Sequence, residues 1–500
     1  MSIQFREIPA NNLVPIFATE FDNSLAAKPG PMPWKNLLIG QATKASAPTG
    51  ITQISSDDQA DSLFGAGSQI ALMVKAFRKN AKYMELYCIA LQDPASNSAA
   101  ASKVLAFTGP ASENGTLSLL IGGQAVNVAV AAEDAATAIA ANVVAKVNAL
   151  TNLPVTAAVG SSGNEHKVTL TAKNKGTAGN GISVCLNFNA GETTPAGVAI
   201  DVFASASSVT LAGGSGDTEF NATNVGNLIE GTWFNAIAIG AGDNATTGNV
   251  AYIKDKLDER WTAVVQQTGV LYYGVGGNKT AAVTAGNARN SQVICIPGLA
   301  NTPSLPCEVA AAAMGAIAVT ALNDPAVPLS NWPVKGIVAP KREDRLGFDS
   351  NNDILRAGVA MLAAGEDGTV YLKRTVTTYK TNAMGASDTS YQQLETVHTL
   401  SYLRWDWNNY MAGKYPHAKL ADDGNEFGPG QIVMTPKKGK AEILTRYKIW
   451  MDKGLVQNFD EFKANVVVER DPDDSKALNF LIPADLIDQL FVCKSLMQFK

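Results

Sequence analysis

The chain has 500 residues, of which 46% are hydrophobic and 17% charged, and its formal net charge at pH 7 is −5. This composition is typical of a globular protein of about two or three domains with a large core, and it excludes disorder over any long span. The acidic balance disfavours a nucleic acid as partner, because neutralising phosphates requires clustered Lys and Arg residues.

The cysteines argue against disulfide and zinc chemistry. They are five in number and scattered, and no CxxC pair is present. We therefore predict buried free thiols in a reducing cytoplasm. These residues are Cys88, Cys185, Cys295, Cys307 and Cys493.

The sequence predicts neither an export signal nor a membrane span. Charged residues occupy the N-terminal stretch where a signal peptide needs an apolar core. The most apolar run, 309–322, is rich in alanine. It is too short to cross a bilayer of about 30 Å at about 1.5 Å per residue. We predict a buried helix there and no direct membrane insertion.

Residues 1–30 are predicted to form an N-terminal arm. Two strand-like pieces, 3–8 and 14–21, are interrupted by Pro9 and Pro15. The arm has too few apolar groups to fold alone, so it either lies disordered or adds as a strand to a sheet edge of another subunit. The side chains assigned to this contact are Ile3, Phe5, Val14 and Ile16.

The first part of an α/β core is predicted over residues 31–101. A buried strand at 36–40 precedes a helix at 57–80 with one apolar face, and a second strand follows at 83–91. This order predicts a right-handed β-α-β unit with parallel strands.

Residues 102–216 have a different sequence pattern from the flanking core and are predicted to form an inserted β-rich domain, similar to a small β-sandwich. Short alternating strands are separated by Gly, Asn and Ser, and one helix is expected at 133–150. Its inner face is assigned to Ile139, Val143 and Val147. The sequence LAGGSGD at the end of this stretch is interpreted as a flexible hinge.

The second part of the core, 217–367, returns to alternating strands and helices. Strands are expected within FNAIAIG, GVLYYGV, QVICIP and GIVAP, with helices at 249–261, 280–290 and 309–322. Alternation at this spacing predicts a mostly parallel sheet that helices cover on both faces.

One glycine-rich segment of this core needs weighing as a phosphate-binding loop. The sequence GVGGNKT, residues 274–280, follows a predicted strand and precedes a predicted helix. Asn278 stands where the phosphate-loop pattern requires glycine before lysine. We favour a plain turn over a nucleotide site.

No catalytic set of residues emerges from the remaining candidates. The histidines, His166, His398 and His417, lie in three different regions, and we interpret His398 as a satisfied core residue. A Cys-His pair built from Cys295 or Cys307 stays open. The acidic cluster of Asp422, Asp423 and Glu426 lacks the order of a calcium loop and is interpreted as a solvated turn. We therefore predict no enzyme activity, no metal and no cofactor.

The C-terminal region, 368–500, begins with a predicted strand at 369–380 and a helix at 391–410. This helix is apolar around most of its circumference. It must therefore be covered on more than one side, and we expect part of the cover to come from other subunits.

A second helix, 440–453, is predicted to carry basic residues on the side opposite its apolar stripe. Arg446 and Lys453 lie on that side, with Lys448 nearby. The simplest interpretation is a solvated face on which Glu442 supports Arg446 at i, i+4.

The chain ends in a predicted alternating strand, 491–499. Its apolar face contains Phe491, Cys493, Met497 and Phe499. An exposed apolar strand promotes aggregation unless it is paired, so we expect it to join subunits as a C-terminal arm. A contact of this kind that does not close into a ring generates a helical array.

Several C-terminal segments carry a family resemblance. They are RTVTTYKTNAMGASDTSY, TLSYLRWDW, KYPHAKLADDG and GPGQIVMTPK. With the N-terminal arm and the inserted domain, they make the chain resemble the tail sheath proteins of contractile phage tails, in their Mu-like branch. The implied fold class is α/β and multidomain. It comprises a mostly parallel α/β core, an inserted β-sandwich-like domain, a C-terminal α+β domain and extended terminal arms.

The resemblance implies a structural subunit of a contractile sheath. Such subunits polymerise helically around an inner tail tube and contract to drive it through the host envelope, with arms that interlace between neighbours. The implied partners are further copies of the chain, the tail tube protein, and the baseplate and tail terminator proteins. The implied location is the virion tail, and the host cytoplasm during assembly.

The resemblance also assigns roles to two regions. A charged helix of the C-terminal domain docks on the tube in such proteins, which makes Arg446, Lys448 and Lys453 tube-facing candidates. The inserted domain would be a dispensable decoration on the outer surface. Two alternatives remain, namely an α/β enzyme or nucleotide-binding protein, and a carbohydrate-binding surface module formed by the insertion.

Overall fold

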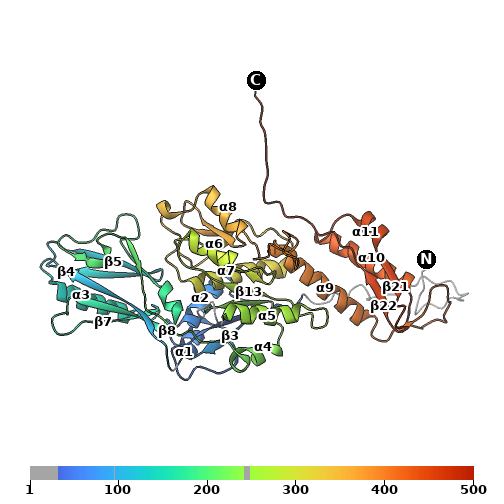
Figure 1. Cartoon of the computed structure of the whole chain (residues 1–500), viewed down its shortest axis with the longest axis horizontal. Coiled ribbons are helices and arrows are strands. Elements are labelled where there is room, and N and C mark those ends of the chain that lie inside the picture. The colour runs from blue at the N-terminus through green and yellow to red at the C-terminus, as the bar shows by residue number, and fades with distance from the viewer. Residues whose placement is uncertain (1–31, 95, 241–247, 500) are drawn as a thin grey trace, which may run out of the picture.

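A computed structural model of the chain describes residues 32–94, 96–240 and 248–499. Three groups of elements follow one another along the long axis of the molecule (Figure 1). An all-β group with one helix lies at one end, an α/β core lies in the middle, and a helical group with a β-hairpin lies at the other end.

The core contains a six-stranded sheet in the order β14-β13-β12-β1-β3-β2. Its strands are parallel except for β2, which pairs antiparallel with β3. The strands are β1 Asn36–Gln41, β2 Ile51–Gln53, β3 Leu86–Leu91, β12 Ala236–Ile239, β13 Val270–Tyr273 and β14 Ile294–Cys295. The predicted α/β class is confirmed.

Helices cover both faces of this sheet, because alternate strand residues enter two different hydrophobic clusters. Leu38 packs with α2 and α7, whereas Leu37 and Ile39 pack with α5 on the opposite face. All six residues of β1 are buried, as a central parallel strand requires. The helices of the core are α1 Asp57–Phe64, α2 Gln69–Asn80, α4 Asn227–Glu230, α5 Asn249–Trp261, α6 Lys279–Asn287 and α7 Pro306–Asn323.

The single helix predicted at 57–80 is wrong, because the structure divides it into α1 and α2. Gly65 and Gly67 adopt φ values of 97° and 74°, in a region that favours glycine. The side chains of Ser56 and Ser68 cap the two helices by accepting backbone N–H groups. Two helices with their own caps therefore replace one.

A second, four-stranded sheet stands beside the first, in the order β15-β17-β18-β16. The strand predicted within GIVAP is wrong, since the pairing residues lie just before it. The strand predicted at 369–380 ends early, at Arg374. The elements of this part are β15 Pro297–Gly298, β16 Trp332–Val334, α8 Phe348–Arg356, β17 Ala360–Ala364 and β18 Val370–Arg374.

The region between the two parts of the core folds into two antiparallel four-stranded sheets, in the orders β10-β4-β8-β7 and β11-β9-β5-β6. One helix, α3 Ala136–Ala149, buries Ile139, Val143 and Val147, as predicted. The strands are β4 Ala100–Thr108, β5 Gly115–Ile121, β6 Gln124–Val130, β7 Val155–Val159, β8 Lys167–Lys175, β9 Ser183–Leu186, β10 Ala199–Ile200 and β11 Ser208–Thr210.

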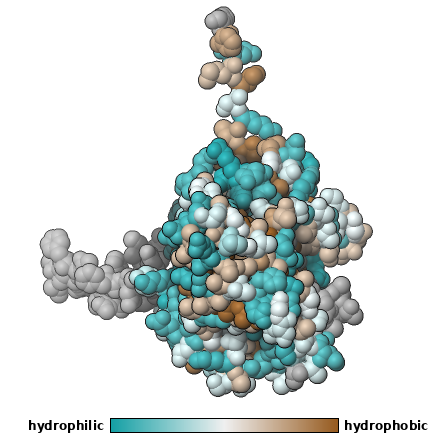
Figure 2. Space-filling model, turned by 90° about the vertical axis from the view of Figure 1, so that its left-hand side faces the viewer, coloured by the Kyte–Doolittle hydropathy of each residue, from teal (hydrophilic) through white to brown (hydrophobic). Residues whose placement is uncertain are grey.

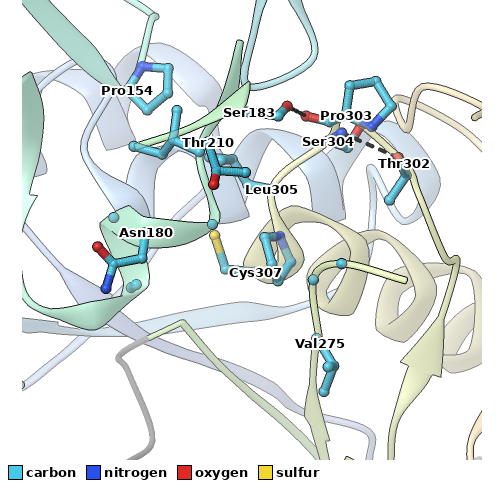
Figure 3. A pocket seen from close by; sticks show the side chains of 18 of the residues that line it. Pro154, Asn180, Ser183, Thr210, Val275, Thr302, Pro303, Ser304, Leu305 and Cys307 are labelled. Carbon is cyan, nitrogen blue, oxygen red and sulfur yellow. Dashed lines mark hydrogen bonds between the residues drawn. The ribbon is translucent and has the colours of Figure 1, made fainter. Parts of the chain in front are cut away.

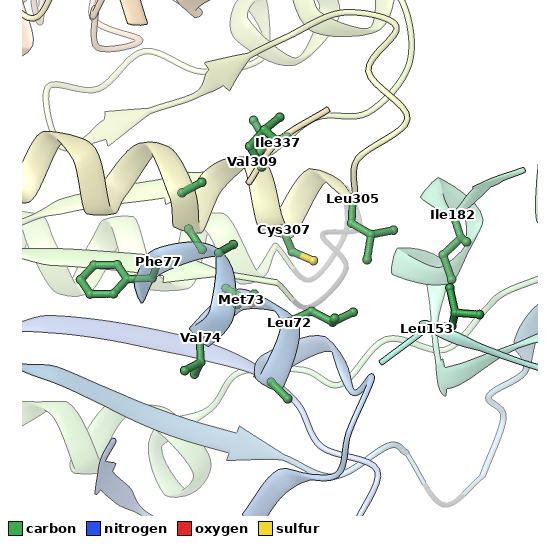
Figure 4. Close-up of a cluster of buried hydrophobic side chains, with 14 of the residues drawn as sticks. Leu72, Met73, Val74, Phe77, Leu153, Ile182, Leu305, Cys307, Val309 and Ile337 are labelled. Atoms are coloured by element: carbon green, nitrogen blue, oxygen red, sulfur yellow. The ribbon is translucent and has the colours of Figure 1, made fainter. Parts of the chain in front are cut away.

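The inserted region is joined to the core by hydrophobic packing. Figure 4 shows Leu153 and Ile182 of the insertion close to Leu72 and Leu305 of the core. All four side chains are buried and belong to one hydrophobic cluster that runs through both regions. The joint is therefore part of the core itself.

Hydrogen bonds reinforce this joint. The carboxylate of Asp93 accepts hydrogen bonds from the side chains of Gln41 at 2.8 Å and Asn174 at 3.1 Å, and from the backbone N–H of Lys175 at 2.9 Å. Ala212 and Ser215 of the LAGGSGD sequence form antiparallel bridges. The interpretation of this sequence as a flexible hinge is wrong, because its backbone is paired.

The C-terminal elements begin with α9 Leu394–Lys414, a helix of 21 residues. Figure 1 shows it leading from the core toward the far end of the molecule, where α10, α11 and a β-hairpin gather. The further elements are β19 Lys419–Leu420, β20 Val433–Met434, α10 Pro436–Asp452, α11 Phe459–Asn465, β21 Val467–Arg470 and β22 Leu478–Leu481.

The strand predicted at 491–499 does not form within the single chain. Residues 487–499 have no helix or strand assignment, and Figure 1 shows them extending away from the body. Figure 2 shows the same segment projecting beyond the surface with apolar side chains on it. The predicted strand therefore has no partner among the described residues, and its pairing with another subunit stays a prediction.

Candidate assembly surfaces

Helix α9 belongs to two hydrophobic cores at once. Leu394 and Val397 pack into the main core, whereas Leu403 packs with Ile443 and Tyr447 of α10. At about 1.5 Å per residue the helix is about 30 Å long, enough to connect the two. Its apolar circumference is thus covered by two regions of its own chain. A share of cover from other subunits stays a prediction.

Contacts between α9 and α10 form three polar steps along the two helices, which we call the polar seam. Tyr402 accepts a hydrogen bond from Lys453, and Tyr410 donates one to Glu442. Between them, the carboxylate of Asp406 receives Arg446 and the indole N–H of Trp450. The α9 residues of the seam are four apart, so they share one helix face.

The central step is a buried ion pair. Asp406 is 1% exposed and Arg446 is 7% exposed. The guanidinium binds both carboxylate oxygens, and its Nε lies 2.5 Å from Oδ2. An ion pair removed from water in this way is costly to break from one side, because the remaining charge stays buried without a partner.

The prediction that Arg446 lies on an exposed face of its helix is wrong. Arg446 lies three residues after Ile443 and four before Trp450, on the buried face of α10. Its partner Asp406 is 40 residues away in sequence, so helical spacing alone gave no sign of the pair. The predicted i, i+4 interaction between Glu442 and Arg446 is also replaced, because each side chain has other partners.

Glu442 instead gathers three donors from the end of α9 and the residues after it. Burial alone would raise the pKa of its carboxyl group, but hydrogen bonds from Lys414, Tyr410 and Tyr415 together lower that pKa. The same contacts and burial raise the pKa of Tyr410. These directions keep Glu442 ionised and Tyr410 protonated, so the third step of the seam is stable at neutral pH.

Two of the three predicted tube-facing residues remain at the surface. Lys448 and Lys453 are exposed. The ammonium group of Lys448 lies 4.8 Å from the ring centre of Phe459, and that of Lys453 lies 5.0 Å from the ring centre of Tyr402. Both charges are held over aromatic rings and stay open to solvent on one side.

The predicted arm residues have different positions. Ile3, Phe5, Val14 and Ile16 lie outside the described residues. Phe491 is partly covered by the guanidinium group of Arg374, 4.8 Å from its ring centre. The other three, Cys493, Met497 and Phe499, are exposed. The prediction of buried free thiols is confirmed for four cysteines and is wrong for Cys493.

The β21–β22 hairpin is a candidate acceptor for such an arm. Its strands pair antiparallel, and Phe480 packs against Trp407 with ring centres 5.2 Å apart. On the opposite face, Val467 and Leu481 are paired across the strands and are 45% and 61% exposed. Within the described part of the chain this sheet has two strands, so both outer edges are free to accept another strand.

The segment GVGGNKT is accounted for by local packing. A Cβ atom on Gly274 would come within 1.8 Å of the carbonyl oxygen of Pro306, so glycine is needed there. The side chain of Asn278 caps α6 by accepting from the N–H of Ala281 at 3.2 Å. Lys279 forms an ion pair of 2.6 Å with Asp353. Each of these roles is structural.

This segment borders the large cavity in Figure 3, of about 840 Å³. Asn180 and Thr210 of the insertion line it on one side, and Val275, Ser304 and Cys307 of the core on the other. At its rim the hydroxyl of Ser183 donates to the carbonyl oxygen of Pro303 at 2.8 Å. The cavity is the crevice left where the two regions meet.

Among the histidine and cysteine candidates, His398, Cys295 and Cys307 are buried, whereas His417 is exposed. His398 is 4% exposed, with its ring 5.4 Å from that of Trp34, and burial lowers its pKa to about 4. Its Nε2 atom has no hydrogen-bond partner in the described structure, so the prediction of a satisfied residue is wrong. Burial also raises the pKa values of Cys295 and Cys307, which disfavours the thiolate that a nucleophile needs.

The acidic cluster is engaged in local contacts. Asp422 pairs with Arg470 at 2.9 Å, and Asp423 accepts from the N–H of Lys437 at 3.0 Å. Among residues 32–94, 96–240 and 248–499, no group of three potential metal ligands occurs. One described helix, α7, is long and apolar enough to span a membrane, but 67% of its apolar stretch is buried inside the protein.

Known proteins resemble this chain over its whole length. A model of the phage tail sheath C-terminal domain matches residues 386–500. The Mu-like prophage FluMu tail sheath protein of Haemophilus influenzae is 31% identical over 503 residues, which cover 100% of both chains.

Two solved structures are similar to the chain at low sequence identity. The sheath tail protein of Desulfitobacterium hafniense is 13% identical, with a TM-score of 0.46 and coverage of 95% of this chain and 100% of that one. The helical sheath of the anti-feeding prophage in its contracted state is 11% identical, with a TM-score of 0.48 and coverage of 98% and 99%. On the strength of the full-length match to the Haemophilus protein, the chain belongs to the Mu-like family of phage tail sheath proteins.

Proposed function

We propose that this protein is the structural subunit of a contractile tail sheath, which polymerises helically around an inner tail tube and contracts to drive the tube through the host envelope. The observation that carries this function is the 31% identity over the full length to a Mu-like tail sheath protein. The protein acts in the virion tail, without enzyme activity, after assembly in the host cytoplasm. Its partners are its own copies, the tube, the baseplate and the tail terminator.

We also propose a division of labour along the chain. Residues 1–30 form an arm, and 31–101 with 217–367 form the α/β core. Residues 102–216 form the inserted domain, and 368–500 form the assembly domain. The bridges of Ala99 with Ser215 and of Ser102 with Ala212 support the limits of the insertion, because they close its entry and exit strands against each other.

The terminal arms make the links between subunits. Phe499 is 94% exposed and Met497 is 89% exposed, and an exposed apolar terminus of this kind is typical of a segment that another chain covers. The β21–β22 hairpin of a neighbour offers free edges for it. About five backbone hydrogen bonds, at about 1 kcal/mol each, would then join each pair of subunits.

The proposed tube contact consists of Lys448 and Lys453. It no longer includes Arg446, because that side chain is buried in an ion pair with Asp406. The two lysines are exposed on the α10 side of the molecule, and Lys437 and Lys438 add positive charge at the other end of the same helix. Acidic groups on the tube are the complement that this charge requires.

The function is tested by imaging the full chain beside a variant that lacks residues 1–22. Negative-stain electron microscopy is expected to show hollow sheaths or rings for the full chain, in the presence of the cognate tube protein if the full chain alone stays monomeric. The truncated variant is expected to lose them. If the full chain stays monomeric on added tubes, the proposed function is overturned.

A further inference from the structure

One carboxyl group in the core accepts hydrogen bonds at only one of its two oxygen atoms. Glu395, in the first turn of α9, is 0% exposed. Its Oε1 atom accepts from the backbone N–H of Leu329 at 3.0 Å and from the hydroxyl of Thr375 at 3.0 Å. Its Oε2 atom is buried and has no hydrogen-bond partner among the described residues.

The surroundings of Glu395 are poor in compensating charge. Arg374 at the end of β18 is the cation that acts on it, but that guanidinium lies over the ring of Phe491. Tyr272 on β13 and Cys295 on β14 interact with Glu395 and are themselves buried, and His398 follows three residues later on α9. The hydroxyl of Tyr272 likewise has no hydrogen-bond partner in the described structure.

An ionised carboxylate at this position would destabilise the folded state. A buried charge is tolerated when it is paired and both oxygens accept hydrogen bonds, and here one oxygen accepts none. A protonated carboxyl group avoids this cost, since it carries no charge and its second oxygen becomes a donor. Burial raises the pKa of Glu395, which the contacts with Leu329, Thr375 and Arg374 oppose without cancelling.

Glu395 also occupies a mechanical joint. Leu329 belongs to the loop after α7, Thr375 follows β18, and Glu395 itself begins the helix that leads to the C-terminal elements. One side chain therefore ties three segments at the point where α9 enters the core.

We propose that Glu395 is a neutral carboxylic acid that locks the start of α9 into the core, and that transfer of its proton to solvent opens this lock. The folded state holds this proton at pH values where the unfolded chain has lost it. Stability is then full below the unfolded pKa and falls as pH rises toward the folded pKa. The joint between the core and the C-terminal elements is thus strongest below the unfolded pKa and weakens as pH rises above it.

The test uses the full chain with Glu308→Gln as background, because Glu308 is a partly buried acid whose pKa is also raised. Infrared difference spectra between this protein and its Glu308→Gln/Glu395→Gln variant should show a protonated carboxyl band at neutral pH that the double variant lacks. The unfolding constant of the single variant, relative to the double variant, should rise by up to about tenfold per pH unit within the titration window. Hydrogen exchange at residues 394–399, compared with the double variant at each pH, should accelerate over the same window.

Identical spectra and parallel pH profiles would overturn the proposal. If the double variant fails to fold, Arg374→Leu in the same background decides. A neutral Glu395 predicts that the carboxyl band then persists to higher pH, because the opposing cation is gone. An ionised Glu395 paired with Arg374 predicts no carboxyl band before the change and a loss of stability at neutral pH after it.

Discussion

The inserted region and the C-terminal elements are attached to the same core in opposite ways. Leu153 and Ile182 join the insertion through a hydrophobic cluster that is continuous with the core. The C-terminal elements are held through α9, and α9 is fastened to α10 by the polar seam around Asp406. Truncating a side chain in a hydrophobic joint lowers stability in proportion to the apolar volume removed. Removing either partner of a buried ion pair leaves the other charge buried without a counter-ion, so the whole interaction is lost.

The largest effect is expected at the seam. Asp406→Ala leaves Arg446 buried without a partner, and the free energy of unfolding of the C-terminal elements should fall by about 3–5 kcal/mol. Urea denaturation followed by tryptophan fluorescence would measure this. Asp422→Ala is the matched control, because it breaks a pair that is exposed on the aspartate side and should cost about 0–1 kcal/mol. Equal losses for both variants would contradict a central role of the seam.

The hydrophobic joint of the insertion is expected to come next. Leu153→Ala removes a fully buried side chain between the two regions and should lower the free energy of unfolding by about 2–5 kcal/mol. Leu490→Ala, at a position that is 77% exposed, is the control and should have little effect. If Leu153→Ala behaved like the control, the insertion would be a separate appendage that can be removed without harm to the core.

The stability of the joint between the insertion and the core should also depend on pH, which would distinguish it from the polar seam. Glu308 lies near Leu305 at the start of α7, and burial raises its pKa to about 7. Because the folded state then holds a proton that the unfolded chain has lost, stability should fall as pH rises from about 4.5 to about 7 and level off above it. Thermal unfolding of Glu308→Gln should lack this decline, and an unchanged slope in the variant would contradict the assignment.

The sequence predicted what depends on local periodicity. The parallel strands around β1, the helix α5 and the inner face of α3 follow from alternation and helical spacing, and the structure has them. The division between α1 and α2 was missed although Gly65 and Gly67 marked it. Their left-handed backbone depends on packing that spacing does not reveal.

The site was predicted less well because its decisive contacts are distant in sequence. Arg446 reads as a surface residue on its own helix, and only Asp406 on α9 explains its burial. The terminal strand at 491–499 was inferred from alternation, but a strand needs a partner for its backbone, and among the described residues these have none. Periodicity reports what a segment could do, and the fold decides which partner it meets.

The smallest effect on stability is expected at the proposed tube surface. Lys448→Glu combined with Lys453→Glu changes exposed charges, so the free energy of unfolding should move by no more than about 0.5 kcal/mol. Assembly on tubes should nevertheless weaken and lose its normal dependence on salt, because reversed charges repel an acidic surface that the lysines attract.

The control for this pair is Lys146→Glu with Lys335→Glu, which makes the same change of net charge at exposed positions of the insertion and the core. Sedimentation of sheaths with tubes across a salt series measures both. Should the two double variants assemble equally well, net charge alone would account for the effect and the tube contact would lie elsewhere. A loss confined to the α10 variant, with its fold intact, would separate the seam, which holds α10 in place, from the surface that α10 presents.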